Sequence, residues 1–418
     1  MGLFRTTFGL GLLVALVAFV VGPVKHIVKI GGFFLTPNPT VLGKGQGPIR
    51  IEDTIHCEDV HHYRPANLLF TACEDYKDTR FSWFPPLGNF VPPTTRGSIH
   101  VVDPKTMKST RLAFENFEGL FATHGIDVIE DPKQADAVYI FAVNHLPNPE
   151  YLQVGEGAEV PKARSQIEIF RHVLQSDTVQ HVRSVQHPLI ETPNDIYAES
   201  PISFYVTNDH FYREGTLRLI EDVWSSAKWS SIIYVQLESL VVPDATAGLH
   251  ASVALKGLWN NNGLGHGRTD AEVVISSAMG GELYLAHVDR SDDSLSVQST
   301  IPFDTLTDNP SYYADPYRSE DDDASGFVVA GISQPCHIPT TSKDPNATDA
   351  SRVWYARPQA GIEVWEKKLL FEDDGSRIRS ASAAVLVPIE PTEDGKKRAW
   401  LFVTGFMSES MVAVQVEL

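Results

Sequence analysis

Six short runs rich in β-branched and aromatic residues recur along the chain, and they restrict its fold more than any other feature of the sequence. Turn clusters such as Glu130-Asp131-Pro132 and Asp373-Asp374-Gly375 bound them, as is usual for β-strands. Another short strand-like segment precedes each run by roughly 10 to 15 residues, so the repeated unit is a small group of strands. The runs are residues 67–72, 137–143, 202–207, 282–288, 327–331 and 399–404.

Six such units predict an all-β fold, a six-bladed β-propeller, because radial repetition protects the edges of the sheets. A pair of large β-sandwiches is the structural alternative. In the body of the chain only residues 166–174 and 217–229 have a helical pattern, which argues against a parallel α/β fold.

The N-terminal segment differs from the body. No charged residue occurs from Thr6 to Val24, and this length approaches the roughly 20 apolar residues that span a bilayer. Residues 22–24 match a signal-peptidase site poorly. We therefore expect an uncleaved hydrophobic signal-anchor helix over residues 1–24, a linker over residues 25–48 and a propeller domain over residues 49–418. A removed signal peptide, which would give a secreted protein, is the alternative.

The anchor places the body in the secretory pathway, in the lumen or outside the cell and attached to a membrane, and the glycosylation acceptor Asn346-Ala347-Thr348 agrees weakly with this. A formal net charge of -19 argues against a nucleic-acid partner and fits a protein that binds hard cations. With only Cys57, Cys73 and Cys336, at most one disulfide can form.

Oxygen-bearing side chains gather in the earlier strand of four units, which is the strand that would line the central tunnel of a propeller. These positions are residues 58–59, 194–195, 260–262 and 308–309. One such pair is most often a turn, but four at matching positions are not explained by turns. Carboxylates and carboxamides that converge on one axis make a site for Ca²⁺, which prefers six to eight oxygen ligands.

Two histidines occupy related places in the second unit. His124 stands at the position that carries the oxygen ligands in the other units, and His145 ends the following strand. A single histidine is usually structural. Two that meet at one mouth of the tunnel beside a cation fit a general base and its proton relay.

Several segments, in this order, resemble the serum paraoxonase/arylesterase family over roughly residues 51–418. They are Glu58-Asp59, His124-Gly125-Ile126, Val143-Asn144-His145, Asn194-Asp195-Ile196, Phe204-Tyr205-Val206-Thr207-Asn208-Asp209-His210, Asn262-Gly263-Leu264, Asp304-Thr305-Leu306-Thr307-Asp308-Asn309 and Cys336-His337. The resemblance implies a six-bladed propeller with two calcium ions in its tunnel, one catalytic and one structural. It also implies small-molecule substrates, namely lipophilic lactones or aryl esters.

Matching positions imply residue roles. The catalytic ion would be held by Glu58, Asn194, Asn262, Asp308 and Asn309, and the structural ion by Asp59, Asp195 and the carbonyl of Ile126. His124 would be the general base that activates water, and His145 would relay its proton. Asp209, His210 and His337 would lie near the pocket, although a packing role is an equal alternative for the two histidines.

One departure from the family concerns ring closure, because no cysteine precedes Cys57 to pair with one near the C-terminus. The ring must therefore close through strand pairing and packing. A zinc site at His56, Cys57, His61 and His62 is an alternative without the ordered motif of a zinc hydrolase. A non-catalytic, membrane-tethered propeller that serves as a binding scaffold is the stronger alternative.

Overall fold

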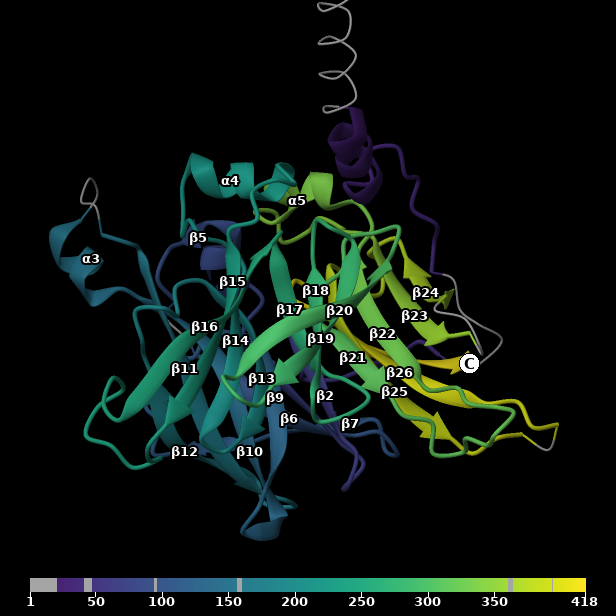
Figure 1. Cartoon of the computed structure of the whole chain (residues 1–418), viewed down its shortest axis with the longest axis horizontal. Coiled ribbons are helices and arrows are strands. Elements are labelled where there is room, and N and C mark those ends of the chain that lie inside the picture. Colours follow the sequence, from purple (N-terminus) through teal and green to yellow (C-terminus); the bar gives the residue numbers. More distant parts are fainter. Residues whose placement is uncertain (1–20, 41–46, 94–95, 156–159, 360–363, 393) are drawn as a thin grey trace, which may run out of the picture.

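A computed structural model describes residues 21–40, 47–93, 96–155, 160–359, 364–392 and 394–418. It contains six sheets of four or five strands, arranged around one axis (Figure 1). The predicted six-bladed β-propeller is therefore confirmed. We number the blades 1 to 6 from the order of their inner strands along the chain.

The blades are listed here from the inner to the outer strand. Blade 1 contains β2 (Asp59–Tyr63), β3 (Leu68–Cys73), β6 (Ser98–Asp103) and β7 (Lys108–Arg111). Blade 2 contains β9 (Thr123–Asp131), β10 (Gln134–Pro147), β11 (Ala163–Val173), β12 (Thr178–Val185) and β8 (Ala113–Glu115). Blade 3 contains β13 (Pro193–Ser200), β14 (Ser203–Asn208), β15 (Ser230–Leu237) and β16 (Leu249–Leu258).

The second half of the ring follows the same order. Blade 4 contains β17 (Asn261–His266), β18 (Glu272–Ser277), β19 (Glu282–Asp289) and β20 (Ser294–Pro302). Blade 5 contains β21 (Pro310–Tyr313), β22 (Gly326–Ile332), β23 (Ser351–Pro358) and β24 (Trp365–Asp373). Blade 6 contains β25 (Ala381–Ile389), β26 (Arg398–Gly405), β27 (Met411–Glu417) and β1 (Ile49–Ile51).

The remaining elements are short and lie between strands. They are α2 (Thr79–Ser82), β4 (Trp83–Phe84), the 3-10 helix η1 (Pro85–Leu87), β5 (Asn89–Phe90), α3 (Pro149–Val154), α4 (Thr216–Val223), the 3-10 helix η2 (Pro335–His337) and α5 (Ile338–Thr341). Figure 1 shows α4 and α5 at the same end of the molecule as the N-terminal helix, which is drawn in purple.

The six runs recognised in the sequence are all strands, and each lies largely or wholly in an interior strand of its blade. They correspond to β3, β10, β14, β22 and β26, which are second strands, and to β19, which is the third strand of blade 4. An interior strand has neighbours on both edges and is covered on both faces by adjacent blades. For this reason its composition is strongly apolar, and the six strands could be predicted from sequence.

Ring closure through strand pairing is also confirmed. The N-terminal β1 pairs antiparallel with β27, so that Ile49 lies opposite Ala413 and Ile51 opposite Met411. Blade 6 is therefore built from both ends of the chain. The Cys57–Cys73 disulfide joins two residues within the first blade region and does not link the chain ends, while Cys336 is a free thiol.

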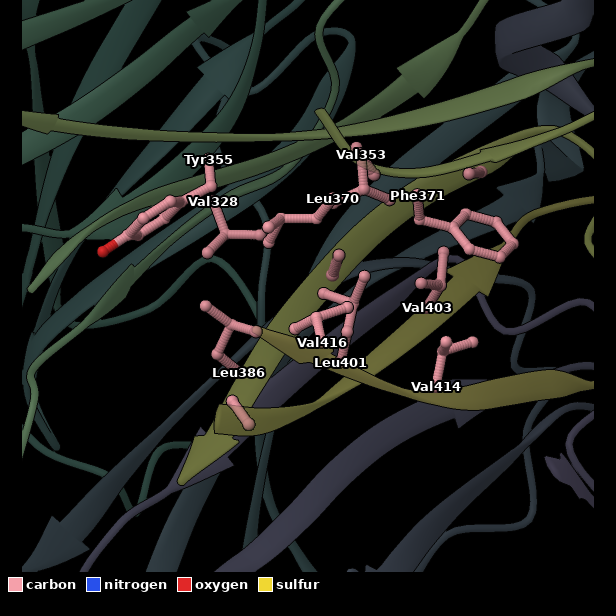
Figure 2. Packing of buried hydrophobic residues seen from close by; sticks show 14 of the residues in the cluster. Val328, Val353, Tyr355, Leu370, Phe371, Leu386, Leu401, Val403, Val414 and Val416 are labelled. Atoms are coloured by element: carbon pink, nitrogen blue, oxygen red, sulfur yellow. The ribbon is translucent and has the colours of Figure 1, made fainter. Parts of the chain in front are cut away.

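The core consists of apolar clusters between neighbouring blades. Figure 2 shows the cluster between blades 5 and 6, where Val328 and Tyr355 of one sheet pack against Leu386 and Leu401 of the next. Similar clusters lie at the other five interfaces between blades. The burial of apolar surface in these clusters is the main term that favours this arrangement.

Two helical predictions have different outcomes. The helix predicted over residues 166–174 is wrong, because these residues belong to β11. Ile167 and Ile169 fill the core between blades 2 and 3, while Phe170 reaches the core between blades 1 and 2. A fully buried strand has apolar residues on both faces, and this resembled a helical pattern. In the segment 217–229, α4 covers only the first half and ends before Trp224.

Residues 21–30 form a helix that contacts the body of the protein. Ile30 is buried, the Nε2 atom of His26 lies 3.0 Å from the carbonyl oxygen of Met279, and Lys29 forms a 2.6 Å ion pair with Asp304. The described part of the predicted linker thus packs against blades 4 and 5. The predicted anchor lies mostly outside the described residues, and no described helix has the length and apolar character needed to cross a membrane.

Candidate active site and cation site

The predicted site residues gather at one end of the tunnel. Each inner strand contacts the inner strands of the two neighbouring blades, so β2, β9, β13, β17, β21 and β25 form a closed ring. Apart from the outermost strands β8 and β1, the chain runs outward through each blade from its inner strand, and the N-terminal ends of the inner strands lie at the same mouth. Most of the candidate residues stand at these ends or directly before them.

Glu58 lies where the last blade meets the first. Its side chain accepts hydrogen bonds from Nδ2 of Asn309 at 2.9 and 3.1 Å, one to each carboxylate oxygen. Its backbone carbonyl accepts hydrogen bonds from the hydroxyls of Ser382 and Thr404, both in blade 6. Blades 5 and 6 thus fix the position of a carboxylate that belongs to blade 1.

Four carboxamide and carboxylate oxygens of the predicted ligands are buried without a hydrogen-bond partner among the described residues. They are Oδ1 of Asn194, Asn262, Asp308 and Asn309. Buried oxygens in native proteins are nearly always hydrogen-bonded or bound to an ion, so four such atoms need an explanation. A hard cation would account for all four, because it takes oxygen ligands of this kind.

Burial and mutual repulsion also raise the pKa values of Glu58 and Asp308. Burial, reinforced by the charges of Asp308 and Asp59, raises the pKa of Glu58 well above its usual range. Burial, with the charge of Asp59, does the same to the pKa of Asp308. Several buried carboxylates with few cations beside them are unfavourable as anions. A bound dication would remove that penalty.

A second pair of acids lies deeper in the tunnel. Oδ2 of Asp59 accepts a hydrogen bond from the backbone N–H of Ile126 at 3.0 Å, and Oδ2 of Asp195 accepts one from that of Leu264 at 2.7 Å. Each acid thereby joins its own blade to the next. Burial raises the pKa of Asp59 to about 7 and that of Asp195 well above its usual range.

Two glycines make room for these residues. A Cβ atom on Gly125 would lie 2.3 Å from Oδ1 of Asp195, and one on Gly263 would lie 2.6 Å from Oδ1 of Asn309. Both positions therefore require glycine for neighbouring blades to approach. This explains why glycine follows His124 and Asn262 in the two sequence motifs.

The donor set fits calcium better than zinc. In the described parts of the chain no three His, Cys, Asp or Glu side chains are grouped so that they could hold a metal ion by themselves. A cation here must use carboxamide and carbonyl oxygens as well, which suits calcium. The zinc alternative is not supported, because Cys57 is bonded to Cys73 and His62 contacts Asn67.

The two histidines of blade 2 are in contact, as predicted. Nε2 of His145 lies 3.0 Å from Nδ1 of His124, and Nδ1 of His145 lies 2.8 Å from the hydroxyl of Ser165. The other nitrogen of His124 lies 3.9 Å from Oε1 of Glu58. A chain of hydrogen-bonded groups that can carry a proton therefore begins beside Glu58 and runs through His124 and His145 to Ser165.

Aromatic residues cover this pair. The ring of Phe84 meets the ring of His124 edge-on at 5.0 Å, and Nε1 of Trp83 donates a hydrogen bond to the carbonyl of His145 at 2.7 Å. Burial lowers the pKa of His124 to about 3 and that of His145 well below its usual range. Both imidazoles are consequently neutral near pH 7, and a neutral imidazole can accept a proton.

Comparison with known proteins identifies the family. The family model described as Arylesterase matches residues 82–387, which is more than half of the 418 residues. This chain belongs to the arylesterase family.

Several curated relatives carry paraoxonase names. Human serum paraoxonase/arylesterase 2 is 26% identical over 278 residues, which cover 65% of this chain and 66% of that protein. Chicken serum paraoxonase/arylesterase 2 is 27% identical over 54% of this chain and 56% of its own length. Rabbit serum paraoxonase/lactonase 3 is 25% identical over 72% of this chain and 74% of its own length. The match thus spans somewhat less than two thirds of the human and chicken relatives.

Asp209 is brought close to the histidine pair of this arylesterase-family protein. It forms ion pairs with Arg218 at 3.3 Å and with Nδ1 of His210 at 3.0 Å, and these offset the effect of burial and hold the pKa of Asp209 below its usual range. His210 also contacts Asp222. Although burial opposes it, the charge of Asp209 raises the pKa of His210 to about 9. His210 is therefore an ion-paired cation. His337 has an exposed side chain in η2.

Arg80 is a site residue that no sequence pattern predicts. This residue of α2 is fully buried, donates hydrogen bonds to the carbonyls of Thr123 at 2.9 Å and His56 at 3.0 Å, and lies over the ring of Phe84 at 4.1 Å. It therefore supports both the residue before His124 and the ring that covers His124. A short insertion between β3 and β6 carries it, and no pattern in such an insertion marks a buried arginine.

An open pocket lies beside His145 in the arylesterase fold. Its unfilled space is about 370 Å³, part of it open to solvent, and its walls include Phe90, Ser165, Arg213 and Arg218. The apolar residues Phe84, Ile332, Phe406 and Met407 form a small cluster of their own. The surroundings of the histidine pair thus combine an apolar cover with a partly charged pocket.

Proposed function

We propose that this protein is a carboxylic ester hydrolase, a calcium-dependent lactonase and arylesterase. The observation that carries the proposal is the buried His124–His145 pair at 3.0 Å, whose free end faces the Glu58 carboxylate. The relatives named arylesterase and lactonase agree with this choice.

The proposed sites use the residues predicted from the sequence. The outer, catalytic ion would be held by Glu58, Asn194, Asn262, Asp308 and Asn309, and the inner, structural ion by Asp59, Asp195 and the Ile126 carbonyl. When bound, calcium supplies a fixed positive charge that polarises a carbonyl and favours the oxyanion. The four unpaired oxygens, Oδ1 of Asn194, Asn262, Asp308 and Asn309, are the support for the outer site.

His124 would act as general base. Its Nε2 atom takes a proton from water, while its Nδ1 proton moves to Nε2 of His145, whose Nδ1–H contacts Ser165. The water oxygen bonds to the carbonyl carbon, the C–O bond to the alcohol breaks, and the stored proton goes to the departing oxygen. The products are an acid and an alcohol, or one hydroxy acid from a lactone.

Lipophilic substrates are favoured by the residues over the pair. Phe84, Phe406, Met407 and Ile332 come from three blade regions and cluster at this mouth. An apolar acyl or aryl group of a substrate that packs against these side chains would be removed from water, which favours its binding. A strongly hydrated group would not gain in this way.

Hydrolysis of phenyl acetate and of a medium-chain lactone by the full chain tests the proposal. We expect turnover of both with calcium and loss of both after a chelator removes it, with recovery when calcium is restored. A chain that binds calcium but hydrolyses neither compound would favour the alternative, a non-catalytic propeller scaffold.

Membrane attachment is part of the proposal, and α4 supports it. This helix buries its charged Arg218 and Glu221 but exposes Leu219, at 62%, and Val223, at 56%. A helix that packs on the core of a soluble protein buries its apolar residues and exposes its charged ones, and α4 does the opposite. The helix at residues 21–30 lies beside it, and the two share an apolar groove. We propose that this end rests on a membrane while the N-terminal segment anchors the chain.

The Cys57–Cys73 disulfide supports a place in the secretory pathway, because such bonds persist in oxidising compartments. Asn346 is exposed and would be open to glycosylation there.

Brominated phosphatidylcholine can test the orientation of α4. In vesicles that carry the full chain, bromine should quench Trp224, which follows α4 and is partly exposed. The double substitution Leu219→Glu and Val223→Glu should remove most of this quenching. Leu152→Glu on α3, also an exposed leucine, is the matched control and should leave it unchanged. Equal quenching in all three proteins would rule out the orientation.

A further inference from the structure

Below the two acid layers the tunnel contains a third polar layer, which no part of the proposed mechanism uses. His61 follows Asp59 by two residues on β2, and His266 follows Leu264 by two residues on β17. The rings of these two histidines, which belong to opposite blades, contact each other edge-on, so both side chains extend into the tunnel. Asp127 of β9 lies between them.

Asp127 joins the two histidines. Its Oδ1 lies 2.9 Å from Nδ1 of His61, and its Oδ2 lies 2.8 Å from Nε2 of His266. The same carboxylate also accepts backbone hydrogen bonds from Val128 and Ala198 at 2.8 and 2.7 Å. Asp127 is thus fixed from four directions, and we call these three side chains, His61, Asp127 and His266, the tunnel bridge.

The tunnel bridge crosses the axis of the propeller. His61 belongs to blade 1 and His266 to blade 4, and these two blades stand opposite each other in a ring of six. Their imidazole centres are nevertheless only 5.8 Å apart. On the other side the ring of Tyr197 lies 4.5 Å from that of His266. Side chains from opposite walls therefore meet here and narrow the passage.

A wide basin opens beneath this level. Its unfilled space is about 2060 Å³, part of it open solvent, and all six blades contribute to its walls. The basin reaches inward as far as Asp59 and Ile126, which are two members of the proposed inner cation site. At the opposite mouth His124 and Phe84 are only 4% and 2% exposed. His61, Asp127 and His266 line the same basin between this inner end and its wide part, so an ion that leaves Asp59 toward the basin passes them.

We propose that the inner cation exchanges with solvent through this basin, and that the tunnel bridge limits the rate of that exchange. The inference rests on the proposed function, because it requires calcium at Asp59 and Asp195. An ion on this route passes the narrow level at which His61 and His266 meet Asp127, so the hydrogen bonds that hold these side chains in place add to the barrier. The outer ion, on the far side of the inner one, does not use this route.

The test uses the full chain loaded with radioactive ⁴⁵Ca²⁺. The number of ions bound per chain is measured first, and the loss of label into excess unlabelled Ca²⁺ is then followed by filtration. We expect two bound ions and two phases of loss, the slower one from the inner site. His266→Ala should accelerate the slow phase by roughly tenfold or more, because a hydrogen bond to a charged group is lost.

Further variants separate the possible results. His61→Ala breaks the other half of the bridge and serves if His266→Ala does not fold; it should also accelerate the slow phase. His287→Ala changes an exposed histidine on β19 and should have no effect. Phe84→Ala opens the opposite mouth and should change the fast phase alone.

Two results would overturn the proposal. One is an unchanged slow phase in folded bridge variants that still bind two ions, and the other is a slow phase that Phe84→Ala accelerates as much as His266→Ala does. A wild-type chain that binds no calcium would instead overturn the proposed function at its metal site, which the ion count reveals before any kinetics.

Discussion

His124→Gln is expected to lower kcat for phenyl acetate and for the lactone by roughly 100-fold or more, the usual contribution of a general base. Glutamine fills similar space and can hydrogen-bond to Nε2 of His145, but it cannot take a proton from water. The fold should survive, because the 3.0 Å contact of His124 with His145 is the one hydrogen bond to another side chain that it makes within the described residues. Calcium affinity should change little.

Two further variants serve as comparisons for His124→Gln. His145→Gln keeps the base and removes the relay, so a smaller loss is expected than in His124→Gln. His287→Gln makes the same chemical change on the exposed face of blade 4 and should retain full activity. If His124→Gln keeps most of its activity while calcium remains bound, water is activated by another group and the role given to the pair is wrong.

Asp308→Asn should have opposite effects on stability with and without calcium. In calcium the variant loses outer-site binding and most activity, because a carboxylate ligand is gone. In chelator it should be more stable than the wild type, because burial among Asp59 and Asp209 penalises the Asp308 anion. A raised folded pKa costs about 1.4 kcal/mol of stability for each unit of the shift at pH values above it.

The stability difference between Asp308→Asn and the wild type in chelator should depend on pH, and the direction of the pKa shift decides how. The pKa of Asp308 is raised on folding, so the wild-type penalty is absent below the ordinary pKa of 3.8 and grows as the pH rises above it. The advantage of Asp308→Asn in chelator should therefore be clear at pH 7 and vanish toward pH 3. Thermal unfolding with and without calcium measures both.

Asp292→Asn, the same change on an exposed turn, is the control for this series. It should move neither melting curve. A wild-type melting temperature that calcium does not raise, together with an Asp308→Asn variant that is less stable in chelator, would contradict the cation site at this position.

The sequence predicted the strands that are covered on both faces, because burial there selects β-branched and aromatic residues without interruption. β22 and β26 are examples, and every residue of β22 is buried. The same rule misled the prediction for residues 166–174. There Phe170 points to the opposite side from Ile169, and apolar residues on two faces suggested a helix. A pattern of burial cannot by itself separate a doubly covered strand from a buried helix.

The candidate site was predictable to the extent that its residues stand at equivalent positions of the repeat. Asn194 and Asn262 lie at the beginnings of inner strands, so they occupy equivalent positions in their blades. Asp127 lies three residues after His124 on β9, but no sequence pattern marks it, because its partners His61 and His266 belong to two other blades. Arg80 had no such signal, because it belongs to an insertion whose path depends on tertiary contacts.

The pairing of β1 with β27 has a consequence for biosynthesis. Ile49–Ile51 is synthesised long before Met411–Glu417, and the interval is on the order of tens of seconds. Until then β1 has no edge to join, and the carbonyl of Glu58 lacks Ser382 and Thr404. Five blades can form before β27 is made, but blade 6 and the surroundings of Glu58 are complete only after β25 to β27 have been synthesised.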